Sequence, residues 1–196
     1  MRVEALSSSG GQRLDGPLLV TPQLFGDGRG FFMESWNQRR FDAAVGQSIS
    51  FVQDNHSRSG RGVLRGLHYQ LEPEPQGKLV RCPAGSILDV AVDLRRSSAS
   101  FGQWVAVDLS ADNQRQLWVP VGFAHGFLTL SDTAEVLYKA SGYWSPSCER
   151  SLRWNDPQLA IAWPLDRLGG VAPLLADKDA AAPTLAEALA AGEVFP

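Results

Sequence analysis

Two of the three histidines in the chain lie in apolar runs that glycines interrupt, and they are the first candidates for chemistry. His68 lies in residues 63–70, two positions after Gly66, and His125 lies in residues 120–127. Imidazole titrates near neutral pH, so these side chains can transfer protons or bind a metal ion. A nearby glycine lets a ligand or a backbone approach closely. A histidine in a strand is also often only a packing residue, so its neighbours decide between these roles.

Three further side chains are candidates because of where the predicted strands place them. Lys78, one of only three lysines, begins a predicted strand and shares a face with Val80, whereas Arg81 faces outward. An ammonium group inside an apolar barrel is costly unless it meets an anion or an oxyanion. Tyr138 fits a packed aromatic as well as a proton donor. Asp179, taken alone, is predicted as a loop residue.

The composition is that of a globular protein with one core. With 196 residues, of which 44% are hydrophobic, we expect a single domain over residues 1–196. The net charge of −3 favours neither nucleic acid nor a membrane surface. Positive charge nevertheless gathers in residues 56–81, which hold four arginines and a lysine against two glutamates. Arginine suits bidentate binding of phosphate oxygens, although scattered, solvated arginines would give the same composition.

Cysteine usage and the lack of apolar segments indicate the compartment. Cys82 and Cys148 form no CxxC pair and are too few for a disulfide scaffold. The N-terminus has no hydrophobic leader, and no run of 18 apolar residues occurs. We therefore expect a cytoplasmic protein that binds neither membrane nor nucleic acid.

The elements that must position these residues are mostly strands, separated by Gly, Pro, Asn and Asp. Strands are expected at residues 18–20, 31–36, 49–55, 63–70, 79–82, 86–94, 104–109, 116–119, 126–130, 135–140 and 151–154. In the sixth of these, alternation places Val90, Val92 and Leu94 on one face. Short helices are expected only at 38–45 and at 184–192, where a capping box opens a C-terminal helical tail over about 183–196. The pattern predicts a mainly β sandwich or barrel.

The sequence Pro120-x-Gly122-x-x-His125 resembles the second motif of the cupins, which are double-stranded β-helix (jelly-roll) barrels with an internal site. The first cupin motif normally contains His-x-His, which binds a metal with the later histidine and a carboxylate. Here that motif is His68-Tyr69-Gln70, so the second ligand is missing. The resemblance implies a cupin-like barrel with a few short helices, no metal, and acid–base chemistry by side chains.

Eight longer motifs run in order from about residue 20 to residue 185. They are Gln53-Asp54-Asn55-His56-Ser57, residues 63–70, residues 77–81, Phe101-Gly102-Gln103-Trp104, residues 115–120, residues 122–127, Trp154-Asn155-Asp156-Pro157 and residues 178–183. Together they resemble the dTDP-4-dehydrorhamnose 3,5-epimerase family of cupin-like sugar-nucleotide epimerases. Several are long and uncommon, which makes the resemblance specific. Two segments depart from the family pattern, since residues 12–16 look like added sequence and residues 165–176 are longer and more apolar than expected.

This resemblance implies an isomerase that converts dTDP-4-dehydro-6-deoxy-D-glucose to dTDP-4-dehydro-L-rhamnose in L-rhamnose biosynthesis. The C3 and C5 protons of that sugar lie beside the C4 carbonyl, so removing either gives an enolate, and reprotonation from the opposite face inverts the carbon. Such proton transfer requires no metal or redox cofactor. The similarity makes His68 the base and Asp179 the carboxylate that orients its imidazole. Lys78 would stabilise the enolate oxygen, and Tyr138 would supply the proton from the other face.

The resemblance also implies a homodimer in which N-terminal strands cross over and bring Arg29 and Glu34 to the partner's site. The positions that match the family's substrate-binding residues are Arg29, Glu34, Gln53, Asp54, Asn55, Arg65, His125, Glu149 and Lys178. Arg29 and Arg65 are the candidates for binding the diphosphate. Trp144 or Tyr143 would stack on thymine, although packing accounts for both aromatic residues equally well.

Two other functions are also compatible with the sequence. An epimerase that inverts only C3 or only C5 would use the same base and acid. A cupin-type binding protein or metal oxygenase would need more ligands in the first motif, and the nearby Glu72 lies in a proline-rich segment that is predicted as a loop.

Overall fold

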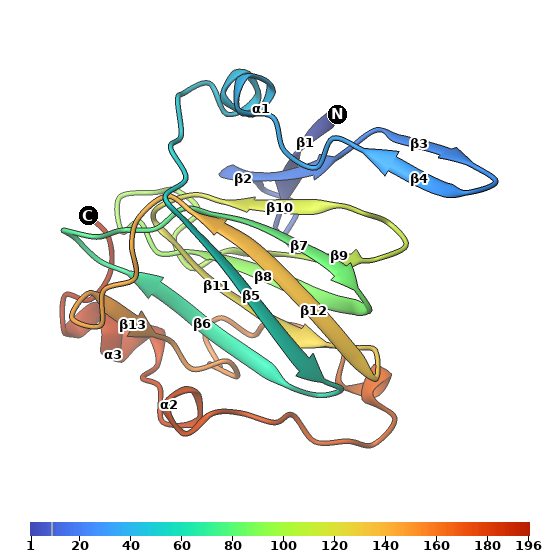
Figure 1. The fold of residues 1–196 in the computed structure, drawn as a ribbon. Helices are drawn as coiled ribbons and strands as arrows, with labels where there is room; N and C mark the ends of the chain where they lie inside the picture. The colour runs from blue at the N-terminus through green and yellow to red at the C-terminus, as the bar shows by residue number, and fades with distance from the viewer. Residues whose placement is uncertain (9) are drawn as a thin grey trace.

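Two antiparallel β-sheets pack face to face and form a barrel (Figure 1). The computed structural model describes residues 1–8 and 10–196. The strand order in the six-stranded sheet is β1 (Arg2–Ser7), β2 (Arg13–Thr21), β10 (Gln116–Val119), β7 (Lys78–Ala84), β12 (Thr133–Ala140) and β5 (Gln53–Gly60). The order in the five-stranded sheet is β13 (Glu149–Ser151), β6 (Leu64–Gln70), β11 (Phe123–Thr129), β8 (Ser86–Asp93) and β9 (Trp104–Ser110). The predicted mainly β architecture is confirmed.

The space between the sheets is filled by residues that alternate inward along the strands. The buried cluster there includes Val80, Ile87, Leu117, Phe127 and Val136. Val80 lies two positions from Lys78 on β7, so the lysine side chain points into the same interior, as its position in the sequence predicted.

The outer face of the five-stranded sheet is covered by the C-terminal part of the chain, drawn orange to red in Figure 1. Val90, Val92 and Leu94 share one buried cluster with Leu185 and Phe195, which confirms the alternation predicted for β8. The backbone of Phe195 also donates a hydrogen bond of 3.0 Å to the carbonyl of Leu94. Both faces of this sheet are therefore buried.

The helix predicted at residues 38–45 is confirmed as α1 (Gln38–Val45). The Asn37 side chain caps its N-terminus, and Gly46 ends it in the left-handed conformation, with φ of 79°. Phe41 of α1 packs edge-on against Trp118, with ring centroids 5.2 Å apart, so the helix lies on the outer face of the six-stranded sheet.

The C-terminal helix, α3 (Leu185–Ala190), begins with the predicted capping box of Thr184 and Glu187 but ends two residues earlier than expected. The expectation of only two helices was wrong. A 3₁₀ helix, η1 (Leu165–Leu168), and α2 (Asp177–Ala180) are also present, and four residues are too few for helical periodicity to reveal them. No helix within residues 1–8 and 10–196 is long and apolar enough to cross a membrane.

Several strand boundaries differ from the prediction. The strand expected at 49–55 begins only at Gln53, because Phe51 packs with the aromatic residues beneath α1 instead of pairing. The last strand pairs at Glu149–Ser151 and not at 151–154, and β1 was not predicted at all. Residues 12–16, expected to be added sequence, lie largely in β2, where Leu14 is buried.

Candidate active site

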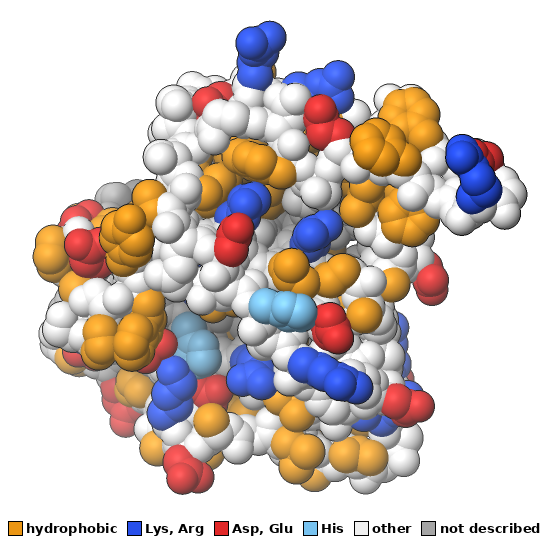
Figure 2. Space-filling model, viewed as in Figure 1, with side chains coloured by type: hydrophobic (Ala, Val, Ile, Leu, Met, Phe, Trp, Pro, Cys, Tyr) orange, Lys and Arg blue, Asp and Glu red, His pale blue; other side chains and the backbone are white. Residues whose placement is uncertain are grey.

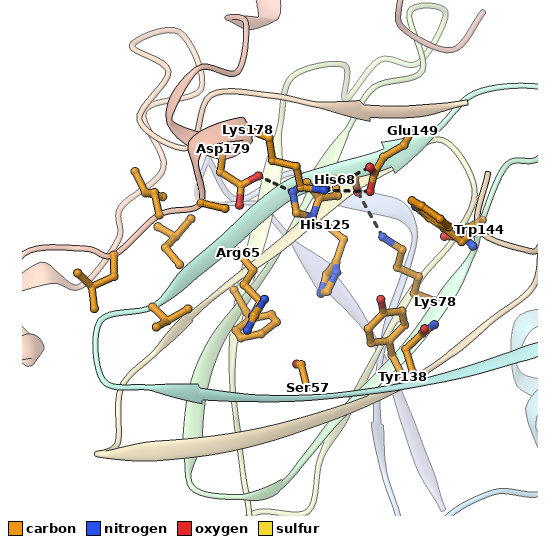
Figure 3. Close-up of a pocket in the computed structure, with 18 of the residues that line it drawn as sticks. Ser57, Arg65, His68, Lys78, His125, Tyr138, Trp144, Glu149, Lys178 and Asp179 are labelled. Atoms are coloured by element: carbon orange, nitrogen blue, oxygen red, sulfur yellow. Dashed lines mark hydrogen bonds and ion pairs between the residues drawn. The ribbon is translucent and has the colours of Figure 1, made fainter. Parts of the chain in front are cut away.

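A cavity of about 600 Å³ opens between the two sheets, within the range of small-molecule sites (Figure 3). All four predicted catalytic residues and six of the nine predicted binding residues line it. They are His68, Lys78, Tyr138 and Asp179, together with Gln53, Asn55, Arg65, His125, Glu149 and Lys178. Residues from β5, β6, β7, β11, β12, β13 and α2 therefore meet at one site.

The imidazole of His68 and the carboxylate of Asp179 form a hydrogen-bonded pair, with Nε2 and Oδ1 2.6 Å apart. Asp179 comes from α2 and is only 2% exposed, so the pair lies at the inner wall of the cavity. Burial alone would raise the pKa of the Asp179 carboxyl, but the hydrogen bond and charge of His68, with the backbone N–H of Gly66, outweigh burial and lower it. The carboxylate therefore stays ionised and can orient the imidazole.

The glycine before His68 is required by a neighbouring strand. Gly66 has φ of 120°, and a Cβ atom there would lie 2.6 Å from the Cα of Gly126 on β11. A glycine here could allow close approach of either a ligand or a backbone, and the structure shows that it allows the backbone of β11 to approach. The two strands lie so close that His68 and His125 are direct cross-strand partners.

Lys78 reaches the cavity from the opposite sheet. Its Nζ atom lies 3.4 Å from the carbonyl oxygen of His68 and 5.9 Å from the centroid of the Tyr138 ring. Burial lowers the pKa of Lys78 to about 8, against the favourable charges of Glu149 and Asp89. At neutral pH the side chain is thus still mostly an ammonium ion, although it is buried.

Tyr138 lies on β12 and faces His68 across the cavity (Figure 3). Burial raises the pKa of its phenol, and the negative charge of Glu149 raises it further. The group therefore remains protonated at neutral pH. A protonated phenol therefore lies on one sheet and the imidazole of His68 lies on the other.

A second histidine–carboxylate pair lies deeper in the barrel, and the sequence interpretation missed its acid. Nε2 of His125 lies 2.7 Å from Oδ1 of Asp89, which is fully buried on β8. Among the described residues, the other carboxylate oxygen of Asp89 has no hydrogen-bond partner. Alternation places Asp89 on the face opposite Val90, but it does not show which face of this doubly buried strand is the inner one.

The outer end of the cavity is polar and aromatic. The ammonium of Lys178 lies 3.2 Å from both carboxylate oxygens of Glu149. Trp144 lines the cavity, and its backbone N–H donates a 3.0 Å hydrogen bond to the side chain of Gln53. Tyr143 is not among the described residues that line the cavity, so Trp144 is the better placed of the two candidates for stacking.

The family model described as dTDP-4-dehydrorhamnose 3,5-epimerase matches residues 12–187. The chain belongs to this family. The epimerase family match begins inside the segment that looked like added sequence, in agreement with the place of that segment in β2.

Among relatives of this epimerase, dTDP-4-dehydrorhamnose 3,5-epimerase of Salmonella typhimurium is 58% identical over 172 residues, covering 88% of this chain and 92% of that protein. The enzyme of the same name from Pseudomonas aeruginosa is also 58% identical, over 171 residues, covering 87% and 92% of the two chains. These identities extend over nearly the whole barrel.

Solved structures of the family share the fold. A dTDP-6-deoxy-D-glucose-3,5-epimerase from Legionella pneumophila, in complex with dTDP-4-keto-L-rhamnose, is 46% identical, with a TM-score of 0.89 over 99% of this chain and 98% of that chain. A 3′-monoepimerase from Streptomyces bikiniensis, in complex with dTDP-quinovose, is 36% identical, with a TM-score of 0.85 over 92% and 89%. The predicted cupin-like jelly-roll barrel is thereby confirmed.

Three predicted binding residues of this epimerase lie away from its cavity. Arg29 is at the tip of the hairpin of β3 (Leu24–Asp27) and β4 (Gly30–Met33), where it pairs with Asp27, and the hairpin projects from the barrel (Figure 1). Glu34 follows the hairpin and lies 3.1 Å from Arg40. Asp54 faces outward from β5 and pairs with Lys139 at 3.0 Å.

The residues of the two cupin motifs form no metal-binding group in this epimerase. Within residues 1–8 and 10–196, no three side chains of His, Cys, Asp or Glu lie together as metal ligands. Each histidine of the cavity is instead engaged by one aspartate.

Proposed function

We propose that the protein inverts both C3 and C5 of dTDP-4-dehydro-6-deoxy-D-glucose and so forms dTDP-4-dehydro-L-rhamnose, without a cofactor, in L-rhamnose biosynthesis. The observation that carries the proposal is that His68 and Tyr138 face one cavity from opposite sheets, with Lys78 beside both. Inversion of a carbon next to a carbonyl requires a base on one face and an acid on the other.

His68 is the proposed base. One ring nitrogen is engaged by Asp179, which leaves the other to accept the proton from C3 or C5. The electron pair of the broken C–H bond moves into the C3–C4 or C4–C5 bond, and the C4 oxygen becomes an enolate oxygen. The ionised Asp179 stabilises the imidazolium that forms.

Lys78 and Tyr138 complete the proposed cycle. The buried ammonium of Lys78 stabilises the enolate oxygen electrostatically, more strongly than it would in water. The phenol of Tyr138 returns a proton to the face opposite His68, and the C4 carbonyl re-forms. Exchange with water then removes the proton from His68 and reprotonates Tyr138 before the second carbon is inverted. The raised pKa of Tyr138 keeps that proton available at neutral pH.

The nucleotide part is proposed to occupy the outer end of the cavity. Arg65 and Lys178 line the cavity and supply positive charge for the diphosphate. Trp144 is exposed at the rim and offers its ring to thymine, and Gln53, Asn55 and Glu149 are the remaining polar groups there. Asp54 is also proposed to bind the substrate, from a position on the outer face of β5 where it pairs with Lys139.

A homodimer is proposed as the active form. The β3–β4 hairpin exposes Leu24, Phe25, Phe31 and Phe32, each 44% to 70% exposed, and Figure 2 shows this apolar group at its upper right. Such a patch is typical of an interaction surface. Seated on a second copy, the hairpin would bring Arg29 and Glu34 to the partner's cavity. We also propose a cytoplasmic location, where the free thiols of Cys82 and Cys148 stay reduced.

Double inversion is favoured over single inversion by the similarities. The 58% identical relatives are named 3,5-epimerases, whereas the 3′-monoepimerase is 36% identical. A metal oxygenase is disfavoured, because the second ligand position of the first cupin motif holds Gln70.

The test is to incubate the enzyme with dTDP-4-dehydro-6-deoxy-D-glucose in deuterated water and follow the sugar protons by NMR. Deuterium at both C3 and C5, with formation of the L-rhamno product, supports the proposal. Exchange and inversion at one carbon only would make the protein a single-site epimerase. An unchanged substrate would contradict both functions.

A further inference from the structure

Gln70 lies at the position where a cupin normally has its second metal-binding histidine, and the proposed proton transfers give it no role. Gln70 is the third residue of the first motif, and alternation points it inward on the same face as His68. Its side chain is buried, with an exposed fraction of 3%, yet it is not one of the described residues that line the cavity.

The side-chain amide of Gln70 is fully used by the backbone of two loops. Its Nε2 atom donates to the carbonyl oxygens of Glu74, at 2.5 Å, and Tyr143, at 3.0 Å. Its Oε1 atom accepts a 2.9 Å hydrogen bond from the backbone N–H of Ser145. One buried side chain therefore ties the loop after β6 to the loop that carries Trp144.

These contacts fix the backbone on both sides of Trp144. Gln70 binds the residue before Trp144 and the residue after it, while the side chain of Gln53 accepts from the N–H of Trp144 itself. Trp144 is 57% exposed, so packing restrains its ring only in part. The direction of the indole at the cavity rim, opposite Asp179 in Figure 3, depends on the backbone that bears it.

We propose that Gln70 is a positioning residue that holds the Trp144 loop, so that the indole is already oriented to stack on the nucleobase of the substrate. The inference rests on the proposed function in one respect, namely that Trp144 binds the base of a dTDP-sugar. Holding a binding group in its bound conformation lowers the entropy lost on association, so Gln70 contributes to nucleotide affinity without touching the nucleotide.

The chemistry of the site accounts for glutamine at this position. Two carbonyl oxygens and one N–H group converge there, and an amide of this length satisfies all three at once. A glutamate carboxylate would keep the acceptor for Ser145 but would face two carbonyl oxygens without a proton to donate. A methionine would fill the volume and leave three backbone groups unpaired.

The experiment compares Gln70→Met, Gln70→Glu and Trp144→Ala with wild type. Calorimetry measures the affinity for dTDP, and steady-state kinetics measure kcat and KM. We expect Gln70→Met and Gln70→Glu to weaken dTDP binding about 3- to 10-fold and to raise KM, with kcat unchanged. Trp144→Ala should weaken dTDP binding by about 5- to 150-fold, the usual range for loss of an aromatic ring under a base. Gln158→Met, an exposed glutamine outside the cavity, is the control and should match wild type.

The double variant Gln70→Met/Trp144→Ala separates positioning from general damage. If Gln70 acts through Trp144, adding Gln70→Met to Trp144→Ala causes no further loss of dTDP affinity. An equal loss in both backgrounds, a fall in kcat, or unchanged dTDP affinity in both Gln70 variants would overturn the inference. Because dTDP binding is measured without turnover, an enzyme that binds dTDP but does not epimerise would refute the proposed function alone.

Discussion

The ammonium of Lys78 on the six-stranded sheet lies 3.4 Å from the backbone carbonyl oxygen of His68 on the five-stranded sheet. This contact joins the two sheets at the point where the proposed proton transfers take place. Lys78 is buried, so its charge is both costly to the fold and strong towards a developing enolate. Stability and catalysis are therefore expected to oppose each other at this residue.

Lys78→Met should stabilise the protein at pH 7 and inactivate it. The pKa of Lys78 is about 8 in the folded chain and 10.5 as the ordinary value, so between these pH values only the unfolded chain binds the proton. The free energy of unfolding of wild type therefore rises with pH over this window. The increase in the free energy of unfolding caused by Lys78→Met should be at most about 3 kcal/mol below pH 8 and should become smaller towards pH 10.5. Urea unfolding at pH 7, 8.5 and 10 measures it, and a pH-independent gain would contradict this account.

His68→Ala and Tyr138→Phe should separate proton removal from proton return. Without His68 no enolate forms, so deuterium exchange and epimerisation should both fall by about 10²- to 10⁴-fold. In Tyr138→Phe the enolate still forms and recaptures a proton from the His68 side, so exchange should persist while inversion is lost. NMR in deuterated water records both rates. Near-normal deuterium exchange in His68→Ala would show that His68 is not the base. Full inversion in Tyr138→Phe would show that Tyr138 is not the acid.

Asp179→Asn should behave as a weakened form of His68→Ala. The amide keeps the size of the side chain but loses the charge that stabilises the imidazolium, and its single oxygen cannot accept from both His68 and the N–H of Gly66. We expect kcat to fall about 10- to 100-fold, with KM little changed. A large rise in KM with normal kcat would instead assign Asp179 to substrate binding.

The resemblance carried by the long, uncommon motifs was enough to predict the fold and most of the residues that meet in the cavity. Strand alternation by itself placed only Lys78 on an inward face. Alternation could not identify Asp89 as a partner of His125, since β8 is buried on both faces and its pattern distinguishes no solvent side. The contact between His68 and Asp179 came from the family resemblance, because α2 is a four-residue helix with no periodic signal.

The N-terminal region shows a different limit of the sequence. Arg29 and Glu34 lie on or beside a hairpin that is not packed on its own barrel, so no pattern within one chain predicts where they act. Residues 49–52 resemble a strand in composition, but tertiary packing of Phe51 overrides that preference.

Mixing two inactive variants should restore activity if the hairpin completes the partner's site. Arg29→Ala and His68→Ala would each fail as a homodimer, but a mixed dimer contains one site with both side chains intact. After re-equilibration at equal concentrations, roughly a quarter of wild-type activity should return, as random pairing in a two-fold dimer requires. Light scattering confirms the dimer, and a mixture that stays inactive would place Arg29 in its own chain's site or outside any site.

Prolonged treatment with EDTA should leave turnover unchanged. Both cavity histidines are engaged by aspartates, and Gln70 occupies the position of the second motif histidine. Metal analysis of the treated enzyme is the necessary control. Loss of activity that a divalent ion restores would replace the acid–base mechanism with a metal-assisted one.

Asp179 lies 111 positions after its partner His68, beyond the last strand of either sheet. A nascent chain that has emerged from the ribosome as far as Ser151 already contains all the strands of both sheets, and they can begin to assemble. The carboxylate follows only after a further stretch of translation, about 1 to 6 seconds at ordinary elongation rates. The residue that holds the imidazole is therefore synthesised after every strand of the barrel, so the proposed base is expected to gain its orienting carboxylate later than its place in the sheet.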